Sequence, residues 1–152
     1  MQVEEVTGGC LCGSVSVRIP ARRNDVGVCH CATCRQWGSG PWMALQVPGA
    51  VISGDDLAVH RSSVFAERGF CRRCGTHIFH RPQEGPELAI SAGLFPTSGL
   101  HIAREIFFDA KPPFYRFVAE SEKRSGASMA REWFPRLLYR RMGRWLGTLR
   151  RK

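Results

Sequence analysis

Residues 69–76 have the sequence Gly69-Phe70-Cys71-Arg72-Arg73-Cys74-Gly75-Thr76. A turn with two cysteines separated by two residues points both sulfur atoms at one metal ion, and Gly75 permits the tight backbone that follows. A second pair, Cys10 and Cys12, lies near the start of the chain. Side chains two residues apart on an extended segment share one face, so these sulfurs can also share an ion. Together the two pairs predict a structural zinc site with four thiolate ligands, which links the start of the chain to its middle.

Arginines flank this predicted site, whose four thiolates would leave one zinc ion with a net charge of about −2. Arg68 precedes the Cys-x-x-Cys turn, and Arg72 and Arg73 lie inside it. We expect these three side chains to offset the negative charge.

The remaining cysteines form a cluster, Cys29-His30-Cys31-Ala32-Thr33-Cys34. It supplies three thiolates and no obvious fourth ligand. A zinc ion with three protein ligands and an open position is typical of a catalytic site, because the open position can take water or a substrate atom. A zinc ion with several thiolate ligands prefers a thiol as its further ligand, and binding to the ion favours deprotonation of that thiol. The cluster therefore predicts a thiol substrate.

Two other interpretations of the cysteines stay open. The chain has seven cysteines, so disulfide pairing would leave one over, and a reducing compartment would disfavour it. A histidine could instead close the second site as a structural site of three cysteines and one histidine. The candidates are His30, His60, His77, His80 and His101.

Length and charge narrow the class of protein. The 152 residues, 43% of them apolar, suffice for one hydrophobic core. Residues 1–122 hold 12 basic and 12 acidic residues, which cancel, whereas residues 123–152 hold 10 basic residues and Glu132. The net charge of +9 therefore belongs to the tail and does not mark the body as a nucleic-acid binder. With no signal-like start and no apolar run of about 18 residues, we expect a cytoplasmic protein.

Short runs separated by turn residues fill residues 3–117 at a spacing of about eight to twelve positions, which is typical of antiparallel all-β folds. Val15, Val17 and Ile19 alternate with polar residues, as in a half-buried strand. No long helical period interrupts the region, so any helix in it should have one or two turns. We predict an all-β domain of small antiparallel sheets over residues 1–118.

A small and polar stretch, residues 119–128, has the composition of a linker. In residues 129–152, arginines recur four apart on one helical face, and Pro135 suits the first turn of such a helix. The opposite face is apolar: Phe134, Leu137, Leu138, Met142, Trp145, Leu146 and Leu149. We predict a basic amphipathic helix that packs on its own domain or contacts a second subunit, an anionic membrane surface or nucleic acid.

The cysteine motifs occur in a fixed order with Phe107 to Tyr115 after them. This ordered set resembles the family of glutathione-dependent formaldehyde-activating enzymes and centromere protein V, over roughly residues 5–117. The resemblance implies layered antiparallel β-sheets, two zinc ions per chain and carbon–sulfur lyase activity. Carried over by motif, it implies a structural zinc on Cys10, Cys12, Cys71 and Cys74, and a catalytic zinc on Cys29, Cys31 and Cys34.

The reaction named for that family joins glutathione to formaldehyde as S-hydroxymethylglutathione. A glutathione-like thiol and an aldehyde are therefore the implied partners. Arg35, Trp37 and Gly38 follow the third cysteine of the cluster, and we expect them to hold the tripeptide, although they can also serve loop structure alone. The alternative function is a binding module in which both zinc ions are structural and the basic tail contacts an anionic membrane or nucleic acid.

Overall fold

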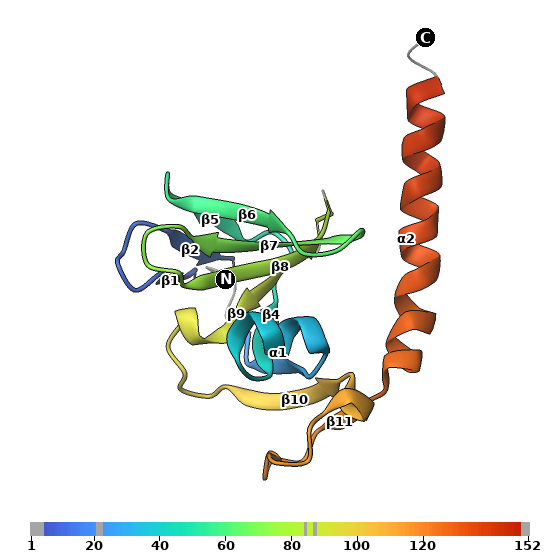
Figure 1. The fold of residues 1–152 in the computed structure, drawn as a ribbon. Coiled ribbons are helices and arrows are strands. Elements are labelled where there is room, and N and C mark those ends of the chain that lie inside the picture. Colours follow the sequence, from blue (N-terminus) through green and yellow to red (C-terminus); the bar gives the residue numbers. More distant parts are fainter. Residues whose placement is uncertain (1–4, 21–22, 84, 87, 150–152) are drawn as a thin grey trace.

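The computed structural model describes residues 5–20, 23–83, 85–86 and 88–149 (Figure 1). Its elements, in chain order, are β1 (Val6–Gly9), β2 (Ser16–Ile19), β3 (Asp25–Cys29), α1 (Ala32–Gly38), β4 (Trp42–Gln46), β5 (Val51–Ser53), β6 (Leu57–Arg61), β7 (Ala66–Cys71), β8 (His77–Pro82), β9 (Ala89–Ser91), η1 (Ala92–Leu94), β10 (His101–Ile106), η2 (Phe108–Ala110), β11 (Glu122–Arg124) and α2 (Gly126–Leu149). The sequence predicts an all-β fold with a C-terminal helix, and the structure is mostly β-sheet with α1 and the C-terminal helix α2. The basic amphipathic character of α2 stays a prediction.

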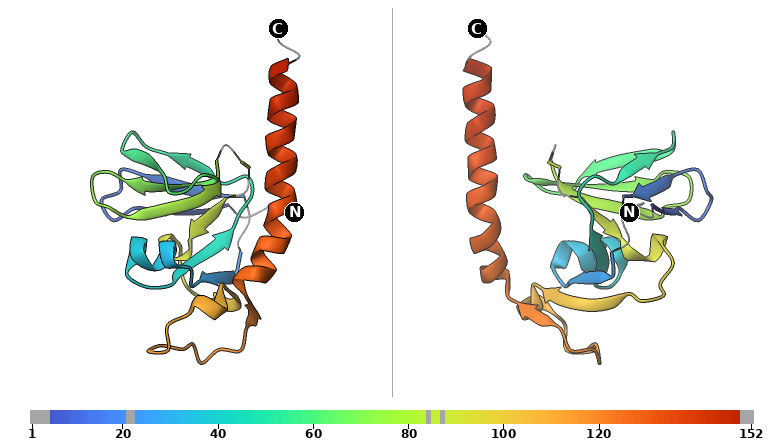
Figure 2. Two further views of the ribbon diagram at one scale, coloured as in Figure 1. Left: turned by 45° about the vertical axis from the view of Figure 1, so that its right-hand side comes forward. Right: turned by 180° about the vertical axis from the view of Figure 1, so that it is seen from behind.

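The strands form two sheets. One has three strands in the order β1-β2-β5, and the other has eight in the order β11-β10-β3-β4-β9-β8-β7-β6. The alternating residues Val15, Val17 and Ile19 are buried, as their pattern predicts, and they belong to one core cluster with Val28 and Ile90 of the larger sheet. This core fixes the two sheets against each other, and α1 packs on the larger sheet beside β4 (Figure 2).

The larger sheet is mixed, so the prediction of purely antiparallel sheets is wrong. β10 pairs in parallel with both β3 and β11, whereas the other pairs in this sheet are antiparallel. A parallel pair needs a long crossover between its strands. The chain meets that need between β3 and β10, because six strands of the two sheets and α1 lie between them in sequence.

The helix α2 begins earlier than the sequence pattern suggests. Asp109 accepts a hydrogen bond from the Gly126 amide at 2.7 Å, and the Ser125 hydroxyl accepts one from the Ser128 amide at 3.2 Å. These contacts start the helix at Gly126 and leave Pro135 inside it, not in its first turn. The expected linker, 119–128, thus includes β11 and the first turn of α2. The division into a domain, a linker and a tail stays a prediction.

The views of Figures 1 and 2 show α2 rising beside the sheets and standing clear of them for most of its length. Met129, near its start, is 7% exposed, whereas Phe134 and Met142 are 68% and 56% exposed. The side chains of Trp145, Leu146 and Leu149 lie outside the described part of the structure. In the described chain, no helix has the length and apolar character needed to span a membrane.

Candidate metal centre

Four cysteines that lie far apart in the sequence converge on one point. Cys10 and Cys12 follow β1, Cys71 ends β7, and Cys74 lies in the turn before β8; their Sγ atoms all lie within 4.8 Å of one another. The Cys12 Sγ is 3.6 Å from that of Cys10 and 3.8 Å from that of Cys71. Tetrahedral zinc with Zn–S bonds of about 2.3 Å needs sulfur atoms roughly 3.8 Å apart. The four residues, named here the four-cysteine cluster, therefore fit one zinc ion.

Two turns hold this cluster in place. Gly13 follows Cys12 and Gly75 follows Cys74, and both glycines have left-handed backbone angles, with φ of 77° and 76°. Residues with a Cβ atom adopt such angles at a cost. The Gly75 amide also donates to the Cys71 carbonyl at 2.8 Å, which closes the turn. The backbone thus directs both pairs of sulfurs to the same side.

The second group, named here the three-cysteine cluster, lies at the junction of β3 and α1. Cys29 ends β3, Cys31 caps the N-terminus of α1, and Cys34 lies in the first turn of that helix. The three Sγ atoms lie within 4.8 Å of one another, and the Cys34 amide donates to the Cys31 Sγ at 3.4 Å. Among the described residues no histidine or carboxylate offers a ligand atom that joins this group of three.

The chemistry of the three thiols also fits a metal ion. A hydrogen bond with Cys29 lowers the pKa of the Cys31 thiol, while the hydrogen bond with Cys31 raises the pKa of the Cys29 thiol. One thiolate therefore opposes the ionisation of its neighbour. A divalent cation bound among the sulfurs removes this opposition, and zinc is the common choice for thiolate ligands. Both clusters could therefore bind metal ions.

Arg68, which the sequence assigns to the four-cysteine cluster, turns instead to the three-cysteine cluster. Its Nη2 donates to the Cys34 Sγ at 3.3 Å, and its guanidinium carbon lies 5.8 Å from the ring centroids of both Trp37 and Trp42. The reason is the alternation of side chains along a strand, since Arg68 and Cys71 are three residues apart on β7 and point to opposite faces. The side chain is 4% exposed, and its Nε has no hydrogen-bond partner.

His80 lies beside Arg68 on the same face of the sheet. The two residues are directly paired across β7 and β8, and the His80 ring centroid is 6.0 Å from that of Trp42. Burial, and after it the positive charge of Arg68, lowers the pKa of His80 to about 4. The imidazole is therefore neutral near pH 7.

His30, between two cysteines of the three-cysteine cluster, points away from the sulfurs. Its Nε2 lies 2.9 Å from the Glu105 carboxylate and its Nδ1 lies 2.8 Å from the Tyr115 hydroxyl. His30 is 0% exposed and Glu105 is 2% exposed, and the Ser121 hydroxyl donates to the other Glu105 oxygen at 2.7 Å. These bonds tie the β3–α1 connection to β10. The sequence does not reveal this network, because its members come from distant segments that share no local motif.

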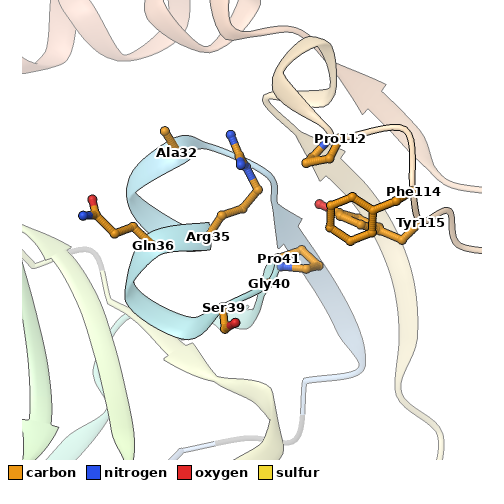
Figure 3. Close-up of a pocket in the computed structure, with 9 residues that line it drawn as sticks. All are labelled: Ala32, Arg35, Gln36, Ser39, Gly40, Pro41, Pro112, Phe114 and Tyr115. Carbon is orange, nitrogen blue, oxygen red and sulfur yellow. The ribbon is translucent and has the colours of Figure 1, made fainter.

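A pocket of about 600 Å³ lies along α1 (Figure 3). Arg35 and Gln36 line it from the helix and Ser39 from the residue that ends it, and Phe114 and Tyr115 face them from the segment after η2. Positions 32, 35, 36 and 39 share one side of an α-helix, whereas positions 34, 37 and 38 share the opposite side.

The three residues expected to hold a tripeptide are therefore split between two sides of α1. Arg35 belongs to the pocket, and its Nε donates to the His30 carbonyl at 3.0 Å. Trp37 packs with its ring centroid 5.0 Å from that of His77, and a Cβ atom added at Gly38 would lie 3.8 Å from the His77 ring. The structure thus leaves Trp37 and Gly38 on the side of the three-cysteine cluster.

These features define a mixed β-sheet protein with two cysteine clusters that could each bind a metal ion. Residues 5–110 match the family model of the glutathione-dependent formaldehyde-activating enzyme. The chain belongs to this family.

A curated relative supports the family assignment, and a solved structure has a similar fold. The chain is 34% identical over 119 residues to an uncharacterized lyase of Schizosaccharomyces pombe, covering 75% of this chain and 86% of the relative. A crystal structure of a Rhodobacter sphaeroides protein has a similar fold, with a TM-score of 0.50 and 22% sequence identity. That similarity covers 62% of this chain and 90% of the other, and at this identity it bears on the fold alone.

Proposed function

We propose that the protein is a zinc-dependent carbon–sulfur lyase whose reaction is the reversible joining of glutathione to formaldehyde as S-hydroxymethylglutathione. The observation that carries the proposal is the difference between the two clusters, since one offers four sulfur ligands and the other three. A three-ligand site leaves a coordination position for a substrate. The family and the lyase name of the Schizosaccharomyces pombe relative support the reaction class.

In this proposal the two clusters have different roles. Cys10, Cys12, Cys71 and Cys74 hold a structural zinc that joins β1 to the β7–β8 turn. Cys29, Cys31 and Cys34 hold the second zinc, which would supply a Lewis-acidic open position that favours the thiolate form of a bound thiol.

The other residues bind and orient the reactants. Arg35 in the pocket offers a guanidinium to a carboxylate of the tripeptide, and Phe114 and Tyr115 supply an apolar wall opposite it. Glu105 holds His30, and through it the loop that carries the cysteine ligands, in one position. Trp37 and Gly38 shape the side of α1 that faces the cluster.

The test is the rate at which glutathione and formaldehyde interconvert with S-hydroxymethylglutathione, measured by exchange NMR on protein of known zinc content. Protein with both clusters loaded should raise this rate above that of the uncatalysed reaction. The variant Cys31→Ser should lose the acceleration together with one zinc ion. A fully loaded protein that leaves the uncatalysed rate unchanged would contradict the proposal.

A further inference from the structure

The guanidinium of Arg68 carries a buried positive charge without an acidic partner. Its side chain is 4% exposed, and no ion pair joins it to a carboxylate among the residues whose contacts the structure gives. An unpaired buried charge is strongly unfavourable unless an anion approaches it. The nearest group that becomes anionic when it binds a metal ion is the Cys34 thiol of the three-cysteine cluster, whose Sγ lies 3.3 Å from the Arg68 Nη2.

Charge balance with the thiolates accounts for only part of this arrangement. Three thiolates on one divalent ion leave about one negative charge, which the guanidinium offsets. The Arg68 Nε still has no acceptor, and within the described chain it is the buried side-chain nitrogen or oxygen left without one. Native structures rarely leave a buried donor without an acceptor. A donor of this kind next to an open metal site is therefore suited to a ligand.

The proposed reaction brings an acceptor to this place. When the thiol sulfur adds to the aldehyde, a C–S bond forms, the C=O π bond breaks and its electron pair moves to the oxygen. That oxygen then takes the proton that the thiol has lost, which gives the hydroxymethyl thioether; in the reverse direction the C–S bond breaks and the proton returns to the sulfur. The oxygen is one carbon away from the reacting sulfur, at the end of the substrate that meets the cluster.

We propose that Arg68 is a catalytic residue that donates a hydrogen bond from Nε to the oxygen on the carbon that bonds the thiol sulfur. The inference rests on the proposed function and adds to it the group that stabilises the developing oxygen anion. Preorganised donors of this kind act most strongly in a site with little water, and the indole rings of Trp37 and Trp42 flank this guanidinium. Nε is enclosed in this structure, so the proposal requires one of these half-buried rings to move before the oxygen can reach it.

A binding experiment tests the anion site without the reaction. Ethanethiol and thioglycolate are both two-carbon thiols, but only thioglycolate carries negatively charged oxygens, which lie one carbon further from the sulfur than the oxygen of the substrate does. Calorimetric titration of zinc-loaded protein should show thioglycolate binding at least about tenfold more tightly, as expected for one charge-assisted hydrogen bond. In Arg68→Met, whose side chain reaches as far as the position of Nε but carries no donor and no charge, the two affinities should become nearly equal. The inference is overturned if the protein has no such preference or if Arg68→Met keeps it.

Kinetics and zinc content separate this role from simple support of the cluster. Arg68→Met should lower kcat by about 10² to 10³-fold with little change in KM for glutathione and with two zinc ions retained. The matched control is Arg81→Met on the neighbouring strand β8, whose guanidinium contacts Glu67, and it should keep kcat. Wild-type kcat in a folded, loaded Arg68→Met protein would overturn the inference.

If Arg68→Met loses zinc or fails to fold, the variant Arg68→Lys tests the proposal instead. It keeps a positive charge near the sulfurs, so zinc content should return, but it lacks the planar Nε donor, so the thioglycolate preference should stay low. Full preference in Arg68→Lys would show that charge alone suffices and would overturn the assignment to Nε. The protein could show a preference for thioglycolate that depends on Arg68 and still fail to accelerate the glutathione reaction. That result would support the anion site and contradict the proposed function.

Discussion

At the scale of single residues, each cysteine cluster has its own consequence when a ligand is removed. Cys74→Ser should leave the four-cysteine cluster with three sulfurs and give unfolded or insoluble protein, because structural zinc binding contributes on the order of 10 kcal/mol to folding. Cys31→Ser should stay folded and lose one zinc ion. Circular dichroism and metal analysis of both variants measure the two outcomes.

The control for this pair is wild-type protein titrated with zinc, since weak loading of the three-cysteine cluster would mimic the loss of an ion. Wild-type protein should hold two zinc ions per chain at saturation. If Cys31→Ser unfolds as readily as Cys74→Ser, the three-cysteine cluster is structural and the enzymatic proposal loses its basis.

The pH response of His80 follows from its surroundings. The folded protein keeps this ring neutral down to a pKa of about 4, while the unfolded chain takes up the proton near its ordinary pKa of about 6.5. The unfolded state thus binds more protons between these values, so the free energy of unfolding falls as the pH drops through this window. NMR titration of the imidazole should give a midpoint near 4, with the signal assigned through His80→Gln. A midpoint near 6.5 would contradict the buried position.

At the scale of elements, Glu105 is the side chain of β10 that bonds the β3–α1 connection, beside the backbone hydrogen bond from the His30 amide to the Ile106 carbonyl. Glu105→Leu should lower the free energy of unfolding by about 1–3 kcal/mol, because it leaves the buried His30 Nε2 and the Ser121 hydroxyl without their carboxylate. Urea unfolding measures the change. Glu120→Leu is the exposed control and should change stability by less than about 0.5 kcal/mol.

If Glu105→Leu and Glu120→Leu changed the free energy of unfolding by the same small amount, the expectation would be wrong. The β3–α1 connection would then be held by its backbone alone. Glu105→Gln supplies a finer comparison. It keeps the shape and most hydrogen bonds, so it should recover much of the stability that Glu105→Leu loses.

Local patterns predict some of these elements and miss others. Alternation predicts the buried positions Val15, Val17 and Ile19, because a strand with one buried face imposes a period of two. The parallel pairing of β10 with β3 has no local signal, since it depends on where the chain returns after several strands. The early start of α2 at Gly126 depends on Asp109, a contact that a helical period does not contain.

The candidate site divides in the same way. The spacing of the cysteines predicts which sulfur atoms meet, because the cysteines of each motif are neighbours in the sequence. Only the choice of which two motifs share an ion then remains. The position of Arg68 follows from strand alternation, but that argument needs the extent of β7, which the sequence does not give residue by residue. The contact of His30 with Glu105 spans 75 positions and depends on the complete sheet.

At the scale of the whole molecule, the tail adds charge to a body that is otherwise nearly balanced. Removing residues 126–152 takes away 8 of the 22 basic residues and 1 of the 13 acidic ones, so 14 basic and 12 acidic residues remain. The cut belongs after Ser125, because β11 pairs with β10 over Glu122–Arg124 and Lys123 lies 3.8 Å from the buried Glu105. A chain ending at residue 121 would lose these contacts.

The shorter protein ending at Ser125 should fold and keep both zinc ions, because all seven cysteines lie before the cut and α2 stands clear of the sheets for most of its length (Figure 1). The chain ending at residue 121 is the comparison and should melt at a lower temperature, since it lacks β11. If the full-length protein binds anionic vesicles, that binding should vanish with residues 126–152 and weaken with added salt, because screened charge attraction would be its source. Metal analysis, thermal unfolding and vesicle sedimentation measure these three results. Loss of zinc or precipitation of the protein that ends at Ser125 would mean instead that the face with Phe134, Leu137 and Leu138 packs on the domain, and that the arginines of α2 only face water.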